Sequence, residues 1–348
     1  MAHLPDPTDR APRNHVFIID GTLSRVDDDD CITHAGQLHA VLQGGKTGAR
    51  QTLGYDRGVQ GLGFSKWIDA AIGRGFNESV IEGYATLASR YEPGDRIFLF
   101  GFSRGAYAAR SIAGLIDRIG LLRKDAATER RVQRAFRYYQ RDEQTTASRA
   151  FARDSCHSAV TIACIGVWDT VKALGLPYPL LSRFFPMATE FHDHELGESV
   201  RAAFQALATD EDRTAYAPIL WERGDWAGHL EQVWFPGAHG DIGGERNCLI
   251  PPIPLTNLSF VWLVERAVAQ GLLMPDGWQD AFPTDAGVPM VGSRTGINRL
   301  FLIRHPREAR IGVDGQAVHP SVFERYKRVK GYRPRAGGIA LPDGTTTA

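Results

Sequence analysis

Short apolar runs and longer segments of helical periodicity alternate along the chain. Four segments have the apolar character of parallel strands buried in a sheet, and they lie at 15–19, 97–100, 160–165 and 231–235. Further segments are expected to be helical, at 32–42, 64–73, 76–90, 105–120, 196–208 and 256–270. The segment 128–153 is rich in Arg, Gln and Ala, and we expect one or two surface helices there. This alternation predicts an α/β fold in which a mostly parallel sheet is flanked by helices on both faces.

Length and composition favour one large core over two separate domains. The chain has 348 residues, 43% of them hydrophobic, which is enough for a single α/β core with helical and loop insertions. We expect a flexible N-terminal tail over 1–14, a single domain over 15–335 and a C-terminal tail over 336–348.

The second apolar run ends in a pentapeptide with a defined geometric meaning. It reads Gly101-Phe-Ser103-Arg-Gly105, and a helical pattern follows directly. A G-x-S-x-G sequence between a strand and a helix is typical of a nucleophile elbow, because the two glycines permit a tight turn that exposes the serine. We therefore predict that Ser103 is a nucleophile at the edge of the sheet, near the positive end of the next helix.

Two later strands also end in polar residues that would serve such a serine. Asp169 follows the strand near 160–165, and His239 follows the strand at 231–235. A serine nucleophile needs a base to take its proton, and the base needs an acid to orient it. The order Ser103, Asp169, His239 is the order of the α/β-hydrolases. Because strand ends of a parallel sheet meet in one crevice, we predict a triad there.

Each of these assignments has an alternative. Asp169 could cap a following helix, and His239 could be an ordinary hydrogen-bonded loop histidine. Asp241 lies two residues after His239, so it could orient that ring in place of Asp169 or hold the loop. We favour Asp169 as the acid and regard Asp241 as a supporting residue.

An acyl-transfer site also needs two N–H donors for the developing oxyanion. One normally comes from the residue after the nucleophile and one from the loop after an earlier strand. In this chain those donors would be Arg104 and the turn at Gly21 and Thr22, with Asp20 shaping that turn. The guanidinium of Arg104 could in addition bind a phosphate or carboxylate, or be an ordinary surface or paired arginine.

An apolar insertion follows the predicted acid. It runs from 176 to 187 and includes Leu180, Leu181, Phe184 and Phe185. These side chains could form a hydrophobic lid or acyl-chain groove. An ordinary packed segment between a strand and a helix is an equal alternative, since large apolar residues in a loop need burial in any case.

Charge and cysteine usage exclude several classes of protein. Lys plus Arg and Asp plus Glu number 40 each, so no net field favours nucleic acid or an anionic membrane. The cysteines at 31, 156, 164 and 248 form no C-x-x-C pair, and we expect reduced, structural thiols. The first residues contain no apolar signal segment. We expect a protein that is cytoplasmic as synthesised.

Two polar clusters have the residue types of metal ligands. They are the aspartates at 27–30 and the segment His192-Asp-His-Glu195. Neither has the helix-spaced His-Glu-x-x-His pattern. We expect solvated charge runs, no metal and no cofactor, with calcium binding as the remaining alternative.

The motifs together resemble a known family, the bacterial and fungal α/β-hydrolase domain that includes the phospholipase effectors of type VI secretion. The matching segments fall in the family's order and cover nearly the whole chain: Asp20-Gly-Thr22, Gly101-Phe-Ser-Arg-Gly-Ala106, Gly166-Val-Trp-Asp-Thr-Val171, Ala208-Thr-Asp-Glu-Asp-Arg213, Trp234 to Gly244 and His319-Pro-Ser-Val322.

The resemblance implies a serine esterase that acts on ester bonds, with glycerophospholipids as the substrate class. It places Ser103, Asp169 and His239 at the positions of the family's triad. It leaves room for peripheral membrane contact, for an immunity or delivery partner and for export, since effectors of this kind need no signal peptide. The alternative from another class is a catalytically silent hydrolase fold that serves as a binding module.

A phosphatase of the haloacid-dehalogenase type is a weaker alternative. Asp20-Gly-Thr22 resembles the start of such an enzyme, in which an aspartate nucleophile stands two residues before the Asp of this motif. That position is occupied here by Ile18. An isoleucine cannot act as a nucleophile, so the sequence favours the esterase.

Overall fold

The described residues form a seven-stranded parallel sheet at the centre of the molecule. The computed structural model describes residues 10–21, 32–45, 50–58, 74–141, 144–171, 195–245, 254–294 and 302–348. The strands are β1 (Asn14–Ile19), β2 (Gln51–Asp56), β3 (Arg96–Phe102), β4 (Ile162–Trp168), β5 (Ala202–Ala208), β6 (His229–Phe235) and β7 (Gln316–Val318). Their spatial order is β2-β1-β3-β4-β5-β6-β7.

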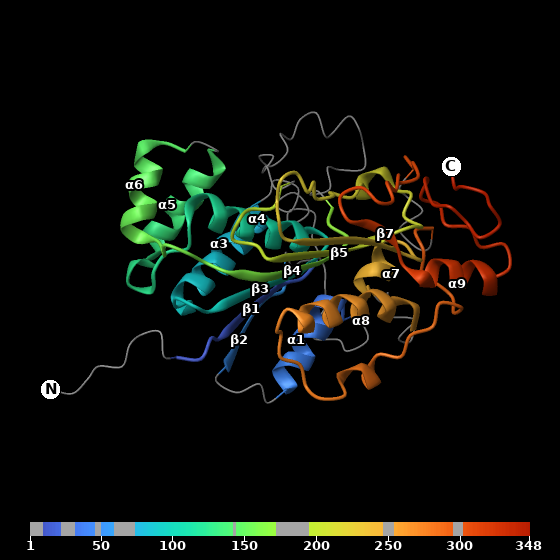
Figure 1. Cartoon of the computed structure of the whole chain (residues 1–348), viewed down its shortest axis with the longest axis horizontal. Coiled ribbons are helices and arrows are strands. Elements are labelled where there is room, and N and C mark those ends of the chain that lie inside the picture. The colour runs from blue at the N-terminus through green and yellow to red at the C-terminus, as the bar shows by residue number, and fades with distance from the viewer. Residues whose placement is uncertain are drawn as a thin grey trace.

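Helices cover both faces of this sheet, which confirms the predicted fold class (Figure 1). The α-helices are α1 (His34–Gly44), α3 (Arg74–Arg90), α4 (Arg104–Ile119), α5 (Glu129–Gln140), α6 (Thr146–Ser155), α7 (His239–Gly243), α8 (Pro254–Ala269) and α9 (Pro320–Arg328). Short 3-10 helices are η3 (Lys124–Ala126), η4 (Thr214–Tyr216) and η5 (Trp278–Ala281). Helices α3 to α6 lie on one face, and α1 and α8 lie on the other (Figure 1).

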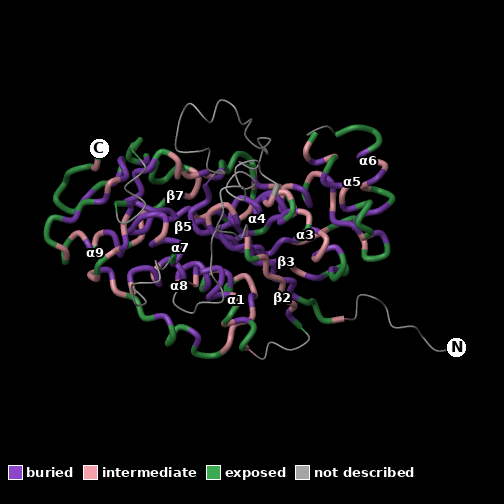
Figure 2. The backbone as a smooth tube through the Cα atoms, turned by 180° about the vertical axis from the view of Figure 1, so that it is seen from behind, coloured by how far each residue is buried: buried purple, intermediate pink, exposed green. Residues whose placement is uncertain are grey.

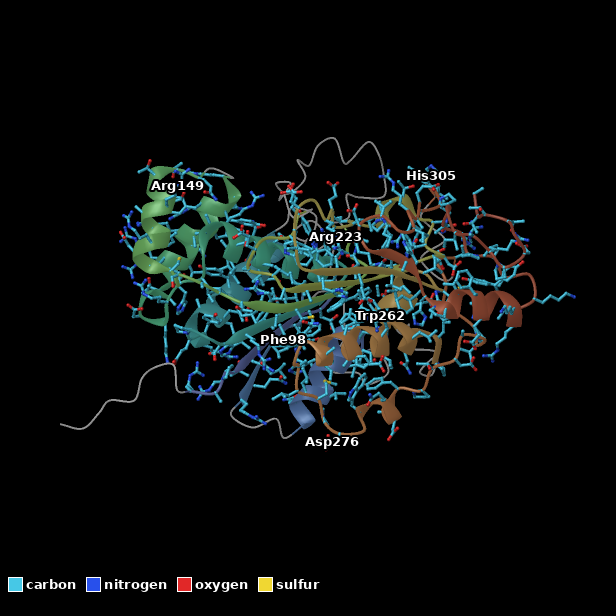
Figure 3. All side chains as sticks on the ribbon, viewed as in Figure 1. Phe98, Arg149, Arg223, Trp262, Asp276 and His305 are labelled. Atoms are coloured by element: carbon cyan, nitrogen blue, oxygen red, sulfur yellow. The ribbon has the colours of Figure 1, made fainter. Side chains whose placement is uncertain are left out.

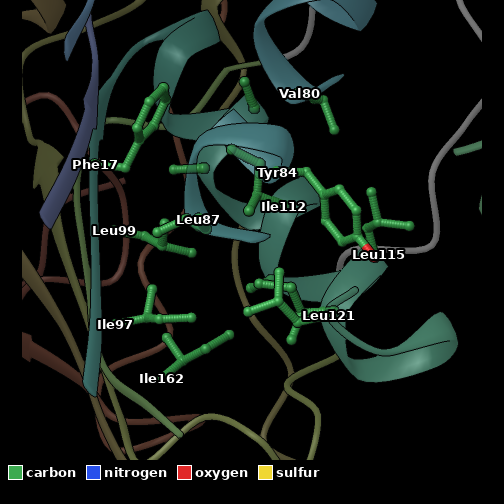
Figure 4. Close-up of a cluster of buried hydrophobic side chains, with 14 of the residues drawn as sticks. Phe17, Val80, Tyr84, Leu87, Ile97, Leu99, Ile112, Leu115, Leu121 and Ile162 are labelled. Carbon is green, nitrogen blue, oxygen red and sulfur yellow. The ribbon is translucent and has the colours of Figure 1, made fainter. Parts of the chain in front are cut away.

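The alternation of side chains along the strands explains this layering. In β1, Phe17 and Ile19 point into the cluster formed with α3 and α4, whereas Val16 and Ile18 belong to the cluster with α1 and α8. Figure 4 shows Phe17 with neighbours from the first cluster. Trp262 of α8 belongs to the second cluster (Figure 3). Strands that are apolar on both faces require helices on both sides, and buried residues follow the strands in Figure 2.

The direction in which successive strands are added to the sheet reverses between β1 and β3. From β1 the chain adds β2 on one side, and then returns to place β3 on the other side. Crevices at such a switch point, beyond the carboxyl ends of the strands, are where open α/β sheets bind ligands. The carboxyl ends of β1 and β3 lead directly to Asp20 and Ser103, so the topology brings these two segments together.

One sequence-based element assignment requires correction, and not every strand was predicted. The segment expected to be a helix at 196–208 contains β5, a strand that is buried along its whole length between β4 and β6. Its alanine-rich sequence favours a helix locally, but pairing on both sides prevails. Strand β2 was not predicted, and the helix expected at 64–73 lies outside the described residues.

The C-terminal segment is also different from the expected tail at 336–348. Ala336, Ile339 and Leu341 are buried against Leu207 of β5 and Trp234 of β6. This third cluster lies at the β5 and β6 end of the sheet, and partly buried side chains of β7 and α9 pack against it (Figure 1). Packed apolar side chains therefore hold the first part of the expected tail against the sheet, whereas residues 342–348 are mostly exposed.

Candidate active site

Ser103 occupies a strained turn between β3 and α4. Its backbone has φ 59° and ψ −118°, a conformation that is rare for a residue with a side chain. Both flanking glycines are required by close backbone approach. A Cβ on Gly101 would lie 2.4 Å from the Gly105 carbonyl oxygen, and a Cβ on Gly105 would lie 2.3 Å from the Ile19 oxygen. The predicted elbow geometry is present.

His239 connects Ser103 with Asp169. Its Nε2 lies 2.9 Å from Ser103 Oγ, and its Nδ1 lies 2.6 Å from Asp169 Oδ2. The three residues come from the ends of β3, β4 and the loop after β6, which places His239 at the start of α7. The structure therefore brings all three predicted triad residues into one continuous hydrogen-bonded chain.

Aromatic rings hold the imidazole on both sides. The ring of Phe102 stacks on His239 at 4.8 Å between centroids, and the ring of Tyr216 lies at the same distance but tilted. The backbone N–H of His239 donates to Glu211 Oε2 at 3.2 Å. The imidazole thus has little freedom to rotate away from Ser103.

Asp169 is completely buried and is paired with an arginine as well as with the histidine. Arg307 donates through two nitrogens to its two carboxylate oxygens, at 2.7 and 2.9 Å. The N–H of Ala208 donates to Asp169 Oδ1 at 3.2 Å. Burial by itself would raise the pKa of Asp169, but Arg307 and His239 outweigh it and hold the pKa below its usual range.

Asp241 faces the loop and makes no contact with the imidazole that would orient it. Its carboxylate accepts backbone N–H bonds from Ala238, Val291 and Gly292 at 2.9, 2.7 and 3.0 Å. Burial raises its pKa despite those bonds. The geometry thus gives the orienting contact to Asp169, and Asp241 ties the His239 loop to the segment around residue 291.

The turn after β1 is organised around the carboxylate of Asp20. It accepts from the Gly21 N–H at 2.6 Å, from Thr33 Oγ1 at 2.6 Å and from the Tyr55 hydroxyl at 2.6 Å. The Gly21 N–H is therefore already hydrogen-bonded, and Thr22 lies outside the described residues. The backbone N–H of Arg104 belongs to the first turn of α4, where no intrahelical acceptor exists.

The guanidinium of Arg104 is half-buried beside this site. Burial lowers its pKa to about 10, against an opposing effect from Tyr216, so the guanidinium stays charged at neutral pH. Within the described part of the chain it makes neither a hydrogen bond nor an ion pair. A desolvated cation next to the nucleophile is suited to bind an anionic group of a ligand.

Three residues of this site were not predicted from the sequence. Arg307, Glu211 and Tyr216 contact Asp169 or His239 although none belongs to the elbow or to a strand end named for catalysis. Glu211 lies in the Ala208–Arg213 segment that carries part of the family resemblance, and this segment was the signal that could have found it. No local pattern points to Arg307.

Several predicted features cannot be placed. The insertion with Leu180, Leu181, Phe184 and Phe185 lies outside the described residues, as do the aspartates at 27–30. Across the described ranges no group of His, Cys, Asp and Glu is arranged to hold a metal ion. None of the helices in those ranges is long and apolar enough to cross a bilayer.

Comparison with known proteins identifies relatives at the level of sequence. The model of the family described as "T6SS, Phospholipase effector Tle1-like, catalytic domain" matches residues 13–266. The uncharacterized protein YEL023C of Saccharomyces cerevisiae is 29% identical over 211 residues, which cover 52% of this chain and 30% of that protein.

Solved structures with a similar arrangement are more distant. The Tle1 effector bound to the VgrG spike of the type 6 secretion system gives a TM-score of 0.40 at 18% identity, covering 68% of this chain and 52% of that chain. Esterase 2 of Thermogutta terrifontis gives 0.38 at 12% identity, covering 78% and 88%. The chain thus spans 30% of the yeast relative and about half of the Tle1 structure.

Proposed function

We propose that this chain, which belongs to the Tle1-like phospholipase effector family of type VI secretion, is a serine esterase that cleaves carboxylic ester bonds in lipids. The single observation that carries the proposal is the hydrogen-bonded chain from Ser103 Oγ through His239 to Asp169. A binding module that had lost catalysis would have no need for this alignment, nor for the strained backbone at Ser103.

The proposed reaction begins with proton transfer. His239 Nε2 takes the proton of Ser103 Oγ as that oxygen attacks the ester carbonyl carbon, and the carbonyl oxygen becomes an oxyanion. Asp169 accepts the hydrogen bond from His239 Nδ1 and stabilises the imidazolium. When the tetrahedral intermediate collapses, the imidazolium gives its proton to the leaving alcohol oxygen and an acyl-serine remains.

Deacylation follows the same path in reverse. Water gives a proton to His239 while its oxygen attacks the acyl carbon, and the proton then returns to Ser103 Oγ as the carboxylic acid leaves. The N–H of Arg104 is one proposed oxyanion donor. The second comes from the Gly21–Thr22 turn, where the Gly21 N–H would have to exchange its bond with Asp20 for the oxyanion.

The charge of Arg104 supports an anionic lipid as substrate. A glycerophospholipid carries its phosphate a few atoms from the ester carbonyl, so a cation on the residue after the nucleophile is well placed to bind it. A neutral ester has no group for this cation. We therefore propose phospholipids as the preferred class within a broader esterase activity.

Product analysis tests both parts of this proposal. Wild type, Ser103→Ala and Arg104→Gln are incubated with mixed phospholipids and, separately, with a neutral short-chain ester, and released fatty acid is quantified. We expect no release by Ser103→Ala from either substrate. Arg104→Gln keeps its backbone N–H and should lose activity on phospholipids much more than on the neutral ester.

Two results would contradict the proposal. Equal release by wild type and Ser103→Ala would remove the esterase assignment. If Arg104→Gln lost the same fraction of activity on both substrates, the phosphate-binding role of the side chain would be contradicted, but the esterase assignment would not.

A further inference from the structure

Arg307 enters the site from a part of the chain that lies beyond the residues matched to the catalytic-domain family, 13–266. We propose that Arg307 is a positioning residue that holds Asp169 ionised and correctly oriented, so that the C-terminal segment carrying it belongs to the catalytic unit. This inference rests on the proposed function, because it assigns a role relative to the proposed triad.

The contact between the two side chains is bidentate. Arg307 uses both terminal nitrogens on Asp169, and the same two nitrogens also donate to backbone oxygens, of Ala208 at 3.3 Å and of Tyr216 at 2.6 Å. A planar guanidinium with four acceptors fixes the plane of the carboxylate that it binds. The carboxylate oxygen Oδ2 is thereby kept towards His239 Nδ1.

The charge of Arg307 matters as much as its shape. Asp169 is fully buried, and a buried carboxylate without a cation tends to take up a proton. A protonated Asp169 would present one fewer acceptor position and no negative charge to the imidazolium. Arg307 is itself buried, so each of the two buried charges is neutralised by the other, and removal of either side chain leaves an unpaired buried charge.

The same arginine links the active site to the end of the chain. The Gly337 N–H donates to the Arg307 carbonyl oxygen at 2.8 Å, and the Ala309 N–H donates to the Gly337 oxygen at 3.0 Å. The Ala336 N–H donates to the Thr209 oxygen at 2.7 Å, directly after β5. These hydrogen bonds hold the segment around Arg307 next to the loop that carries Glu211 and Tyr216.

Arg325 provides a matched control in the same part of the chain. It is also buried, and its guanidinium donates to the carbonyl oxygens of Ala286 and Val288. As in Arg307, its Nε has no partner within the described structure. It has no bond to Asp169 or His239 in the described ranges. Its charge acts on Asp241, which fixes the His239 loop but does not orient the imidazole. Its removal should therefore lower stability without acting on the bonds that join Asp169, His239 and Ser103.

Chemical rescue is the decisive experiment. For the full-length wild type, Arg307→Ala, Arg307→Lys and Arg325→Ala, kcat/KM on a neutral soluble ester is measured across pH, and folding is checked by thermal unfolding. Guanidinium chloride is added to Arg307→Ala at millimolar concentration, far below the molar range that unfolds proteins. Urea and sodium chloride at equal concentrations are the neutral and ionic controls.

We expect Arg307→Ala to lose about two powers of ten in kcat, less than the four that an altered acid costs in a comparable triad. KM should change little, and the acidic limb of the pH profile should move to higher pH because Asp169 takes up a proton more readily. Guanidinium, but neither urea nor sodium chloride, should restore activity with saturation. Arg325→Ala should keep the wild-type pH profile and show no rescue.

The outcomes separate the failure of this inference from the failure of the proposed function. A folded Arg307→Ala with wild-type kcat and pH profile overturns the positioning role. A loss that guanidinium does not restore, shared equally by Arg325→Ala, assigns Arg307 a structural role only. If Arg307→Ala does not fold, Arg307→Lys is measured in its place. Lysine keeps the positive charge but cannot make the bidentate contact with Asp169, so we expect a lower kcat. A wild-type kcat of Arg307→Lys would overturn the positioning role. Activity that survives Ser103→Ala overturns the esterase itself.

Discussion

At the scale of single residues, two buried aspartates near one histidine have different tasks because different atoms face them. Asp169 faces the imidazole and a guanidinium, whereas Asp241 faces three backbone N–H groups. The first arrangement favours the charged form and can stabilise an imidazolium. The second arrangement fixes a loop.

This difference predicts distinct effects of two matched substitutions. Asp169→Asn should fold but lose about four powers of ten in kcat, because the amide cannot stabilise the imidazolium and favours the wrong tautomer. Asp241→Asn should lower the melting temperature and keep a much larger share of activity. Ester hydrolysis and thermal unfolding of both variants check this, and near-wild-type turnover by Asp169→Asn would move the acid role to another carboxylate.

Sequence reasoning placed the three polar residues of the site for a physical reason. Ser103, Asp169 and His239 follow buried strands, and parallel strands deliver their ends to a common edge. Arg307 could not be found in this way. It lies 138 residues from Asp169 in a region without a strong pattern, and only the folded chain brings them together.

At the scale of secondary-structure elements, β5 shows where local propensity fails. Its sequence is Ala202-Ala-Phe-Gln-Ala-Leu-Ala208, which favours a helix when it is considered alone. In the sheet it pairs with β4 on one side and β6 on the other. The buried side chain of Gln205 forms hydrogen bonds with Thr170, Ile219 and Gln232. Strands such as β3, with larger apolar residues and flanking turn signals, were predicted correctly.

The elbow between β3 and α4 predicts a strict requirement for glycine. Gly105→Ala would drive a methyl group into the backbone oxygens of Ile19 and Asp20, which cannot move without displacing β1. We expect a loss of about 1–3 kcal/mol in the free energy of unfolding, with loss of esterase activity as well. Gly44→Ala, at the end of α1 with open space around it, is the control.

Denaturant unfolding of the two variants measures this difference. A Gly105→Ala protein as stable and active as Gly44→Ala would show that β1 and α4 do not approach each other as closely as the elbow geometry requires.

At the scale of the whole molecule, the segment after α8 completes both the core and the active site. Its apolar residues bury Trp234 and Leu207, and its arginine reaches Asp169. The same region contains Tyr332, whose hydroxyl donates to the buried Asp210 at 2.9 Å. Folding of this segment and integrity of the site are therefore coupled.

Asp210 should make stability depend on pH. Burial raises its pKa to about 6, although Gly237, Tyr332 and Thr209 donate hydrogen bonds to it and oppose this rise. Because the folded-state pKa is above the usual value of 3.8, its favourable contribution is complete below about pH 4 and is lost as pH rises through 6. A rise of this size in one pKa corresponds to about 3 kcal/mol in the free energy of unfolding.

The measurement compares unfolding free energies of wild type and Asp210→Asn between pH 4 and 7.5. The half-buried His319 changes the wild-type curve in the opposite sense, since desolvation of its ring lowers its pKa to about 4. We therefore use the difference between the two proteins, which cancels that effect. The difference should shift in favour of Asp210→Asn as pH rises, and a constant difference would contradict a raised pKa of Asp210.

Reaction with a fluorophosphonate, followed by intact-mass and peptide analysis, measures whether Ser103 is an activated nucleophile. We expect one adduct on the wild type, located on Ser103, absent from Ser103→Ala and formed much more slowly by His239→Ala, because His239 takes the proton of the serine hydroxyl. A well-folded wild type that remains unlabelled, or an adduct that persists in Ser103→Ala, would contradict this expectation.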